Sequence, residues 1–519
     1  MVDILVIGAG IAGLSSAIGA KESGSRVLVA SKALATSSQS SMAQGGMNVA
    51  LGNVQEDKVE LHIEDTLKSA HGLADKEMVT KMCQNGVDAI AFLEKIGVPF
   101  SRIDGAKSAI KSIAQRKLGG ASRIRACYAQ DYTGLKILHT MYDYALKLGV
   151  EFNSGLYLLD LMADNGKVCG AVFLDIATSE IKKIYAKSVV LATGGYGGIY
   201  YGHTTNMHSS TGDGLGAILR AGGVTSGMEF VQFHPTALKS SSVLISESAR
   251  GEGGYLVNSD GERFVDELKP RDEVARAIFE QINSGKDVFL DLRHLGADKI
   301  MKLMPQEAHL AKFYEGVDIS KELVPIKSVA HYSMGGALVD KSFRVKGLDN
   351  CLAVGEVSNA RVHGANRLGG NSLLEVVTFG LEAGRVASKL ENSQSKDFDY
   401  NFNLPFEADE INIYNLKREL GDLMYKKAGI IRNKEDLQSL SADIEKISLL
   451  VKNGAIRDRS KEYNQELIEY LELKNALLVA KYIAKGALLR EESRGAHFRS
   501  DYPKESLEFA KDIELRVEQ

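Results

Sequence analysis

The chain has 519 residues, of which 44% are hydrophobic and 25% are charged, and its net charge is −4. A chain of this length is too long for one simple domain, so two or three domains are expected. The composition is typical of a globular protein, and without a basic tract it does not indicate a nucleic acid or an anionic membrane as a partner.

The cysteines, Cys83, Cys127, Cys169 and Cys351, are scattered and form no C-x-x-C pair. We therefore predict no metal site in this chain, neither an iron–sulfur cluster nor a structural zinc, and a reducing compartment. No apolar run reaches the ~20 residues that a membrane span needs. A strand expected from residue 2 leaves no room for a signal peptide. These features predict a cytoplasmic protein that reaches the cytoplasmic face of the membrane only through partner subunits.

A nucleotide-binding pattern opens the sequence. The apolar run Val2–Ile7 is followed by Gly8-Ala9-Gly10-Ile11-Ala12-Gly13, a helical pattern to about Ser23 and a strand at Arg26–Ala30. This order of strand, glycine turn, helix and strand is the dinucleotide fingerprint in its required context. The first glycine allows the turn, the second lets a pyrophosphate approach, and the third lets helix and strand pack. The helix N-terminus is expected to face the phosphates.

The acidic residue that often ends the second strand of this unit is missing, since Ser31-Lys32 stand there. Ser31 can still bond a ribose hydroxyl, but this position does not distinguish FAD from NAD. The stretch Ser37–Gly46 is small, polar and ends in two glycines. It could wrap a ribityl chain, and the alternative is a flexible serine loop.

The middle of the chain alternates between strand and helix patterns. Helices are predicted over Val59–Leu93 and from Asp131 to about Leu148, an antiparallel meander over Glu151–Met162, Val168–Ile176 and Glu180–Ala186, and a buried strand at Ser188–Thr193. Asp213 opens a further helix and could either bond a ribose or cap that helix.

From about Met228 to Ala330 the alternating pattern stops and a self-contained insert begins. Its predicted elements are strands at Gly254–Asn258 and Val288–Leu292 and helices at Asp272–Ile282 and near Asp298–Leu303. A sheet strand returns at Cys351–Gly355. The C-terminal part is predicted to be a helical bundle over Ala408–Lys427, Lys434–Lys452 and Gln465–Leu489.

The stretch His363–Leu373 combines three glycines, Arg367 and the small polar residues Asn371 and Ser372, directly before an apolar helical run. Glycines allow a flat ligand to approach, and an arginine fixed beside a helix N-terminus suits a carboxylate. We interpret it as the meeting place of a flavin ring and a dicarboxylate. The alternative is a loop before a core helix, with the arginine in a structural ion pair.

Polar clusters around the insert complete the candidate site. They are Phe233-His234-Pro235, Ser246-Glu247-Ser248-Ala249-Arg250, Pro270-Arg271-Asp272, His331-Tyr332-Ser333-Met334-Gly335-Gly336 and Asn366-Arg367. Each alone has a structural alternative: a loop histidine, a salt bridge or a helix cap. Most of them lie in turns marked by glycine or proline, where site residues tend to occur.

Together these motifs resemble the flavoprotein subunits of fumarate reductase and succinate dehydrogenase, in the FAD-dependent oxidoreductase 2 superfamily that includes L-aspartate oxidase. The similarity covers nearly the whole chain, including Gly8–Gly13, Met42–Gly46, Asp131–Gly134, Glu229–Pro235, Arg250–Gly254, Pro270–Arg276, His331–Gly336, His363–Leu373 and Arg490–Arg499.

The resemblance implies an α/β fold: a Rossmann-like FAD-binding domain at 1–227 and 331–400, an inserted α+β capping domain at 228–330 and a C-terminal helical domain at 401–519. It implies FAD bound by Gly8, Ala9, Gly10, Ile11, Ala12, Gly13, Ser31, Lys32, Ser38, Gln44, Gly45, Gly46, Asp213, Glu356, Ser372 and Leu373. It implies a dicarboxylate, fumarate or succinate, held by His234, Ser246, His331 and Arg367. It makes Arg271 the proton donor, with Glu247 and Arg250 as its relay to solvent.

Two departures from the family pattern refine these expectations. Membrane-bound members carry a flavin-linking histidine five residues before the glutamine of Ala-Gln-Gly-Gly, and here that position is Gln39. We therefore predict non-covalent FAD. In the family the covalent link raises the flavin potential and favours succinate oxidation, so its absence favours fumarate reduction, or L-aspartate oxidase, whose FAD is also free. Beyond Arg490–Pro503 only a short charged tail remains, where members of larger complexes have more.

The family expectation for the electron partner is an iron–sulfur subunit. Two alternatives stay open from the sequence. One is L-aspartate oxidase, which shares most site residues. The other is a flavin-carrying electron-transfer subunit without substrate chemistry, which would not need His234, Arg271, His331 and Arg367 together.

Overall fold

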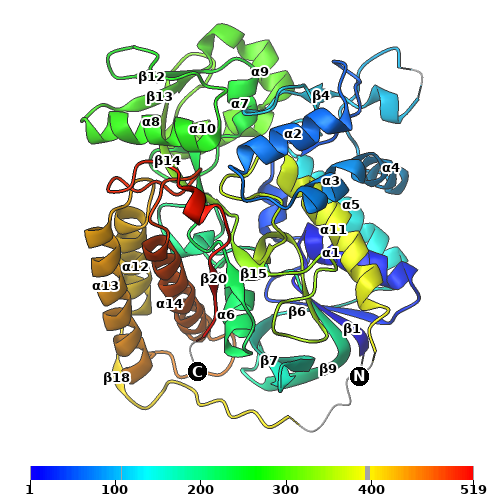
Figure 1. Cartoon of the computed structure of the whole chain (residues 1–519), viewed down its shortest axis with the longest axis vertical. Coiled ribbons are helices and arrows are strands. Elements are labelled where there is room, and N and C mark those ends of the chain that lie inside the picture. Colours follow the sequence, from blue (N-terminus) through cyan, green and yellow to red (C-terminus); the bar gives the residue numbers. More distant parts are fainter. Residues whose placement is uncertain (1, 107, 392–397, 518–519) are drawn as a thin grey trace.

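The structure is a computed structural model that describes residues 2–106, 108–391 and 398–517 (Figure 1). A large sheet with covering helices lies at the lower right of Figure 1, an insert with its own sheet lies at the top, and a helical bundle lies at the lower left.

The large sheet has the strand order β6-β2-β1-β9-β8-β7, with β16 also paired to β9. Strands β1, β2, β6 and β16 and the second half of β9 run parallel, whereas β8 pairs antiparallel with the first half of β9 and β7 pairs antiparallel with β8. Their bounds are β1 (Val2–Ile7), β2 (Val27–Ser31), β6 (Glu151–Ser154), β7 (Leu156–Asp164), β8 (Lys167–Asp175), β9 (Ile181–Leu191) and β16 (Cys351–Ala353).

Two strand predictions in this sheet are wrong. The segment Glu151–Met162 is not one strand, because Gly155 takes a positive φ of 80° and separates β6 from β7. The two strands predicted at Glu180–Ala186 and Ser188–Thr193 are one continuous strand, β9. Its first half is partly exposed and its second half is buried, so one strand carries two sequence patterns.

Helices α1 (Ile11–Glu22) and α11 (Asn371–Ala387) pack closely together in this part of the fold. Their contact depends on glycines: a Cβ on Gly19 would lie 2.1 Å from the Leu381 carbonyl oxygen, and a Cβ on Gly384 would lie 2.0 Å from that of Ser16. The contact holds the N-termini of both helices in place. The other helices of this part are α2 (Val59–Ser69), α3 (Lys76–Gln84), α4 (Gly86–Ile96), α5 (Thr133–Lys147) and α6 (Asp213–Arg220).

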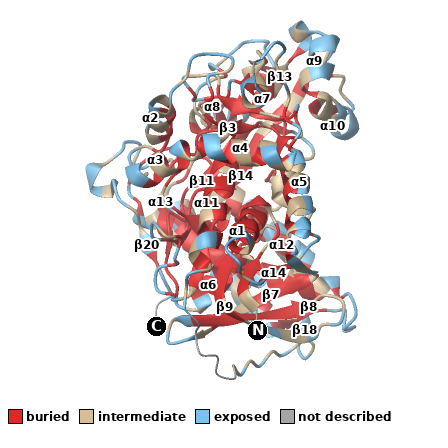
Figure 2. Ribbon diagram, turned by 90° about the vertical axis from the view of Figure 1, so that its right-hand side faces the viewer, coloured by how far each residue is buried: buried red, intermediate tan, exposed pale blue. Residues whose placement is uncertain are grey.

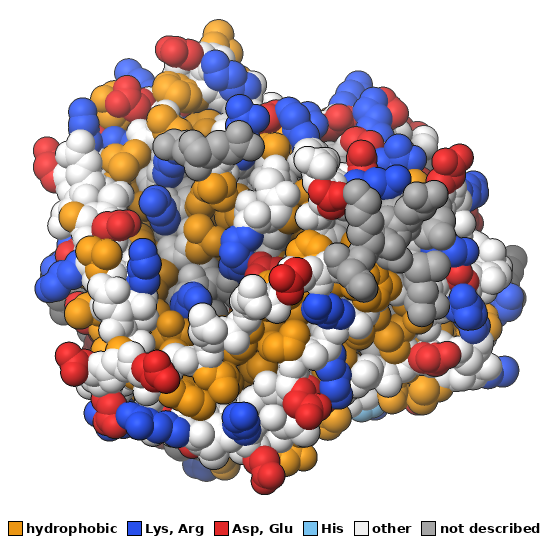
Figure 3. Space-filling view, turned by 90° about the horizontal axis from the view of Figure 1, so that it is seen from below, with side chains coloured by type: hydrophobic (Ala, Val, Ile, Leu, Met, Phe, Trp, Pro, Cys, Tyr) orange, Lys and Arg blue, Asp and Glu red, His pale blue; other side chains and the backbone are white. Residues whose placement is uncertain are grey.

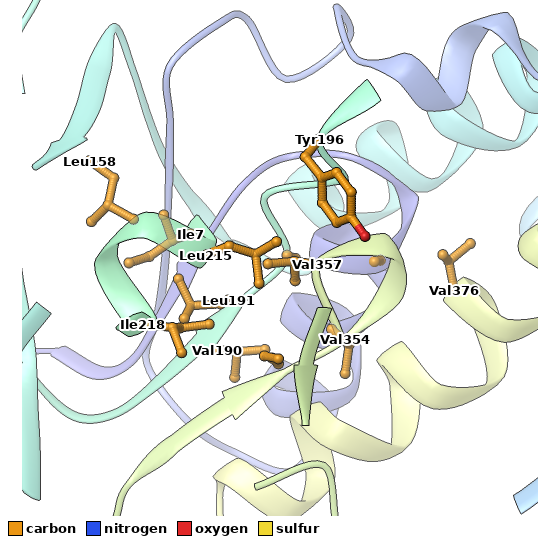
Figure 4. Packing of buried hydrophobic residues seen from close by; sticks show 14 of the residues in the cluster. Ile7, Leu158, Val190, Leu191, Tyr196, Leu215, Ile218, Val354, Val357 and Val376 are labelled. Atoms are coloured by element: carbon orange, nitrogen blue, oxygen red, sulfur yellow. The ribbon is translucent and has the colours of Figure 1, made fainter. Parts of the chain in front are cut away.

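The hydrophobic core of this part reaches the carboxyl ends of the parallel strands. Figure 4 shows Ile7 of β1 and Leu191 of β9 close to Leu215 and Ile218 of α6, and all four side chains are buried. Ligands of open α/β sheets bind beside such strand ends.

The insert has its own sheet, in the order β11-β14-β13-β12, and its own core. Its strands are β11 (Val231–Leu238), β12 (Tyr255–Asn258), β13 (Val288–Asp291) and β14 (Val324–Ser333), and its helices are α7 (Glu247–Gly251), α8 (Arg271–Asn283), α9 (Ala297–Leu303) and α10 (Pro305–Glu315).

The sequence prediction missed β11, β14 and α10. Every residue of β11 is buried, so the strand lacks the alternation by which a half-exposed strand is found. Its Pro235 also argues against a strand, but it lies where the pairing with β14 shifts register, a place that accepts proline.

The C-terminal bundle consists of α12 (Ile413–Lys427), α13 (Lys434–Asn453) and α14 (Gln465–Leu489), close to the predicted ranges. The residues before these helices are Asn412, Asn433 and Asn464. Each accepts a backbone N–H bond of the first turn through its side chain, so these asparagines define the helix starts.

Short strands complete the fold: β3 (Met47–Asn48), β4 (Gln115–Arg116), β5 (Ala126–Cys127), β10 (Thr225–Ser226), β15 (Gly336–Leu338), β17 (Ser358–Asn359), β18 (Asp409–Glu410), β19 (Gly454–Ala455) and β20 (Glu514–Leu515). Burial is concentrated in the sheets and the helices packed on them (Figure 2). Seen from below, the surface carries interspersed charges of both signs (Figure 3). Among the described residues, no helix has the length and apolarity to cross a membrane.

Candidate active site

A pocket runs from the glycine turn after β1 to the inner side of the insert. Most of the predicted site residues line it: Gly8, Ala9, Gly10, Ala12, Ser31, Lys32, Ser38, Gln44, Gly45, Gly46, Asp213, His234, Ser246, Glu247, Arg271, His331, Glu356, Arg367, Ser372 and Leu373. Of the predicted set, Ile11, Gly13 and Arg250 are not lining residues within the described chain. Residues separated by more than 300 positions therefore border one space.

The glycine turn has the geometry that its sequence predicts. Gly8 has a φ of 107°, and a Cβ there would lie 2.2 Å from the Ala192 carbonyl oxygen. A Cβ on Gly13 would lie 1.9 Å from the Gly8 carbonyl oxygen, so Gly13 serves helix–strand packing rather than the pocket wall. The N-terminus of α1 thus faces the pocket, as a phosphate-binding turn requires.

The pocket wall is chemically suited to a flavin nucleotide. Within the described part of the chain, Ser38 Oγ, Gln44 Oε1 and Thr193 Oγ1 are buried, line the pocket and make no hydrogen bond. Buried polar atoms are rarely left without partners, so these atoms indicate a polar ligand. The first turn of α11, with Ser372 and Leu373, forms another part of the wall, so the helix end that leaves backbone N–H groups without helical partners lies beside the pocket.

Glu356 lies at the edge of the same wall. Its Oε1 accepts hydrogen bonds from the Ser333 backbone N–H at 2.9 Å and the Ser333 hydroxyl at 3.2 Å. Burial raises the pKa of this carboxyl to about 7. A carboxyl with this pKa can be protonated near neutral pH and can then donate a hydrogen bond to a ligand.

Arg271 is held at the start of α8 by two partners. Its Nε and Nη2 donate to Glu247 Oε2 at 3.1 and 2.6 Å, and its Nη1 donates to Gln232 Oε1 at 3.0 Å. The arginine side chain is only 8% exposed. This fixed orientation directs the guanidinium at the pocket.

Glu247 connects Arg271 with Arg250. Its Oε1 lies 3.5 Å from Arg250 Nη2, and Arg250 also donates to the Glu267 carbonyl oxygen. Burial alone would raise the pKa of Glu247, but the charges of Arg271 and Arg250 outweigh burial and lower it. Burial lowers the pKa of Arg250.

Glycines on two sides leave room for the Glu247 carboxylate. A Cβ on Gly119 would lie 2.4 Å from Glu247 Oε1, and a Cβ on Gly369 would lie 2.3 Å from Oε2. The carboxylate is therefore enclosed by backbone from two distant parts of the chain, which keeps it in one place.

The predicted histidines lie side by side in the pocket wall, in edge contact with each other. The ring centroids of His234 and His331 are 4.8 Å apart. Burial lowers the pKa of each imidazole well below its usual value, and nearby cationic groups lower it further, so both are neutral at pH 7. The Thr236 backbone N–H donates to His234 Nδ1 at 3.2 Å, which places the imidazole proton of His234 on Nε2.

Arg367 lies over the ring of Tyr332, with 4.1 Å from its Cζ to the ring centroid. The Tyr332 hydroxyl donates to Glu375 Oε2 at 3.3 Å, and His363 lies 2.8 Å from the same oxygen. Burial and the charge of Arg271 lower the pKa of Arg367 to about 10. Within the described chain, Arg367 Nε makes no hydrogen bond and can therefore bind an anion. The alternative considered above, a structural ion pair, does not occupy this nitrogen.

Ser246 caps α7 and also lines the pocket. Its Oγ accepts the Ser248 backbone N–H at 3.2 Å, and its own N–H donates to Glu307 Oε1 at 3.1 Å. Burial raises the pKa of Glu307 to about 8.

Three features of the site were not predicted from the sequence. They are Gln232, Glu307 and the contact of Tyr332 with Arg367. Gln232 donates to the Arg367 carbonyl oxygen at 2.8 Å while it accepts from Arg271, so it joins the two arginines. It lies two residues before His234, a spacing that brings side chains to the same face of a strand and could have drawn attention to it. Nothing in the sequence marks Glu307.

Comparison with known proteins gives a consistent result. Residues 3–373 match the family described as "FAD binding domain", and residues 417–514 match "Fumarate reductase flavoprotein C-term". The chain is 38% identical to the succinate dehydrogenase flavoprotein subunit of Rickettsia bellii, over 96% of this chain and 90% of the relative. It is 38% identical to the 8-methylmenaquinol:fumarate reductase flavoprotein subunit of Wolinella succinogenes, over 97% of this chain and 86% of the relative.

Solved structures agree with these relatives. The E. coli quinol fumarate reductase chain superposes with a TM-score of 0.92 at 32% identity, covering 100% of this chain and 94% of that one. Fold and sequence together define an FAD-dependent oxidoreductase with a Rossmann-like FAD-binding domain, an inserted α+β capping domain and a C-terminal helical domain.

The chain belongs to the family of fumarate reductase and succinate dehydrogenase flavoprotein subunits. The predicted resemblance and fold class are confirmed. The predicted domain boundaries and the role of each site residue stay predictions. The relatives are succinate dehydrogenase and fumarate reductase subunits, so they do not favour the L-aspartate oxidase alternative. Because these relatives belong to enzymes, they also do not favour the alternative of an electron-transfer subunit without substrate chemistry.

Proposed function

We propose that this protein interconverts fumarate and succinate, with fumarate reduction as the favoured direction. The observation that carries the proposal is the convergence of Arg271, Arg367 and two neutral histidines on the pocket that holds the glycine turn. Two cations and two N–H donors suit a small dicarboxylate, because its carboxylates need charge-assisted hydrogen bonds when water is excluded.

The binding residues have distinct tasks. Arg367 would hold one carboxylate with parallel N–H bonds, and His234 and Ser246 would bind the other end of the substrate. His331 is held in place by a hydrogen bond between its Nδ1 and the Thr205 hydroxyl, with 2.7 Å between Nδ1 and Oγ1. Fixed donors of this kind stabilise the negative charge that develops on the substrate during reduction.

Reduction of fumarate needs a hydride at one alkene carbon and a proton at the other. Reduced FAD supplies the hydride when it is bound in the pocket. Arg271 would donate the proton from its guanidinium. An arginine is a very weak acid, with a pKa above ~12, so it can act only in a dry site where other cations crowd it. Arg367 and Arg250 would provide this crowding. After the transfer, Glu247 would accept a proton from Arg250 and pass it to Arg271, and Arg250 would regain its proton from solvent.

We further propose that the FAD is bound non-covalently. Support comes from Gln39, whose side-chain oxygen accepts the Met207 backbone N–H at 2.8 Å and whose amide has no nucleophilic nitrogen for a flavin link. When the purified holoprotein is precipitated with acid, all yellow colour should remain in the supernatant. Flavin that stays on the precipitated chain would contradict this prediction.

An iron–sulfur subunit is the proposed electron partner. Among the described residues, no group of three or more metal-ligating side chains could hold a metal ion, so electrons would come from outside this chain. The relatives are themselves named as subunits. We keep the cytoplasmic location, with any membrane contact made through partners, as part of the proposal.

The proposed function is tested by anaerobic assays of the FAD-loaded protein with fumarate, succinate and L-aspartate. Reduced viologen should be oxidised with fumarate, and a dye should be reduced more slowly with succinate. Reduction of the bound flavin by L-aspartate, without activity towards succinate, would instead support the oxidase.

A further inference from the structure

The second strand of the nucleotide-binding unit ends in a lysine instead of an acid, and the structure shows what this lysine does. Lys32 directly follows β2, and its Nζ lies 2.7 Å from Asp213 Oδ2 and 2.7 Å from Glu472 Oε1. Lys32 and Asp213 line the pocket, whereas Glu472 of α14 is buried behind them. In this type of fold an acidic residue at the end of β2 binds a ribose. Here Asp213, at the start of α6, brings a carboxylate to that place through its contact with Lys32.

The Asp213 carboxylate is fixed at both oxygens. Lys32 binds Oδ2, while Oδ1 accepts hydrogen bonds of 3.0 Å from the Tyr157 hydroxyl, the Thr211 hydroxyl and the Asn475 side-chain amide. Asn475 is also on α14, and its Oδ1 accepts from Arg220 Nη1 at 2.8 Å. One turn of a C-terminal helix therefore supplies two of the groups that orient the Lys32–Asp213 pair.

The same turn is anchored further inside the bundle. Glu472 Oε2 lies 3.1 Å from Nζ of Lys417 on α12, and Lys417 also pairs with Glu469. Negative and positive charges alternate along this series of ion pairs, which runs Asp213, Lys32, Glu472, Lys417 and Glu469. The Glu472 and Lys417 side chains are only 4% and 5% exposed. Helix α14 packs directly on α6, the helix that begins at Asp213 (Figure 1).

We infer that the C-terminal bundle is part of the cofactor site, with Glu472 and Asn475 as positioning residues that hold Lys32 and Asp213 for the adenosine half of the dinucleotide. The inference rests on the proposed binding of FAD in this pocket. When Glu472 is neutralised, Lys32 keeps only Asp213 as an acidic partner and Lys417 keeps only Glu469, so the position of the Lys32 ammonium beside the pocket is expected to change.

The variant that tests this inference is Glu472→Gln, which keeps the shape of the side chain and removes its charge. We expect the Kd of the apoprotein for FAD, measured by quenching of flavin fluorescence, to rise at least tenfold. The matched control is Glu445→Gln on α13, whose carboxylate pairs with Lys481 at 4.0 Å on the surface of the same bundle. Its FAD Kd should stay within twofold of the wild-type value.

A structural role alone predicts a different result. It would lower the Tm of the Glu472→Gln apoprotein but leave the FAD Kd of the folded protein within threefold of wild type, and that outcome would overturn the inference. A wild-type protein that binds no FAD would instead overturn the proposed function.

A second measurement needs no variant. Because coupling between two sites is reciprocal, FAD that uses the Lys32–Asp213 pair must stabilise α14. Addition of FAD to the wild-type apoprotein should slow amide hydrogen exchange around residues 472–475 at least tenfold, with no comparable change in the outer helix α13. Unchanged exchange in α14 on saturation with FAD would overturn the inference, even if the Glu472→Gln variant fails to fold.

Discussion

The Arg271→Lys variant should lose fumarate reduction by about 10²- to 10⁴-fold in kcat while it still binds FAD, since positioned proton transfer contributes rate factors of this size. Arg271 uses separate nitrogens for Glu247 and Gln232, so the guanidinium has one fixed orientation. A lysine has a single nitrogen on a flexible stem and cannot hold both partners in the same geometry. The measurement is viologen-linked fumarate reduction, with flavin content determined on the same sample.

A matched control for Arg271 exists in the same domain. Arg263 also pairs with a glutamate, Glu267, through two nitrogens, but its side chain is 53% exposed and does not line the pocket. Arg263→Lys should keep kcat within threefold of wild type. An Arg271→Lys protein that keeps more than a tenth of the wild-type kcat would exclude Arg271 as the proton donor.

The Arg367→Met variant should bind dicarboxylates about 10²- to 10⁴-fold more weakly. Two charge-assisted hydrogen bonds contribute about 1.5–3 kcal/mol each, which gives this range for a bidentate carboxylate. The methionine loses the cation–π contact of the guanidinium with the Tyr332 ring, but its thioether can still lie against that ring, so loss of packing should add little. The Kd is measured by titrating the oxidised holoprotein with succinate and following the flavin absorbance.

Arg385→Met is the control for this charge removal. Arg385 is on α11, the helix that follows Arg367, and its side chain is exposed. The control should leave the succinate Kd unchanged within twofold. An Arg367→Met protein with wild-type succinate affinity would show that the carboxylate binds elsewhere in the pocket.

Local features could be predicted from the sequence because they depend on neighbouring residues. The glycine turn from Gly8 to Gly13 needs only a strand, small residues and a helix in order, and its geometry follows from the contacts that a Cβ would make. The bundle helices were predictable for the same reason, since apolar spacing and asparagine caps are local signals.

The assembly of the site was not accessible from local pattern. His234, Arg271, His331 and Arg367 are brought together where the insert contacts the loop before α11, so only the resemblance to a family pointed to them as a set. Strand β11 carries one of them and was missed because it is buried along its whole length. Glu472 was missed because its partner Lys32 is 440 residues away in the sequence.

The proposed function requires a flavin and a dicarboxylate to share the pocket between the nucleotide-binding part and the insert. Its most direct test is a single-turnover experiment: the holoprotein is reduced with dithionite, freed of excess reductant, and mixed with fumarate without oxygen. We expect the flavin to be reoxidised at a rate that saturates with the fumarate concentration, and one succinate to form per FAD. Flavin that stays reduced with fumarate, yet is reoxidised by ferricyanide, would contradict it.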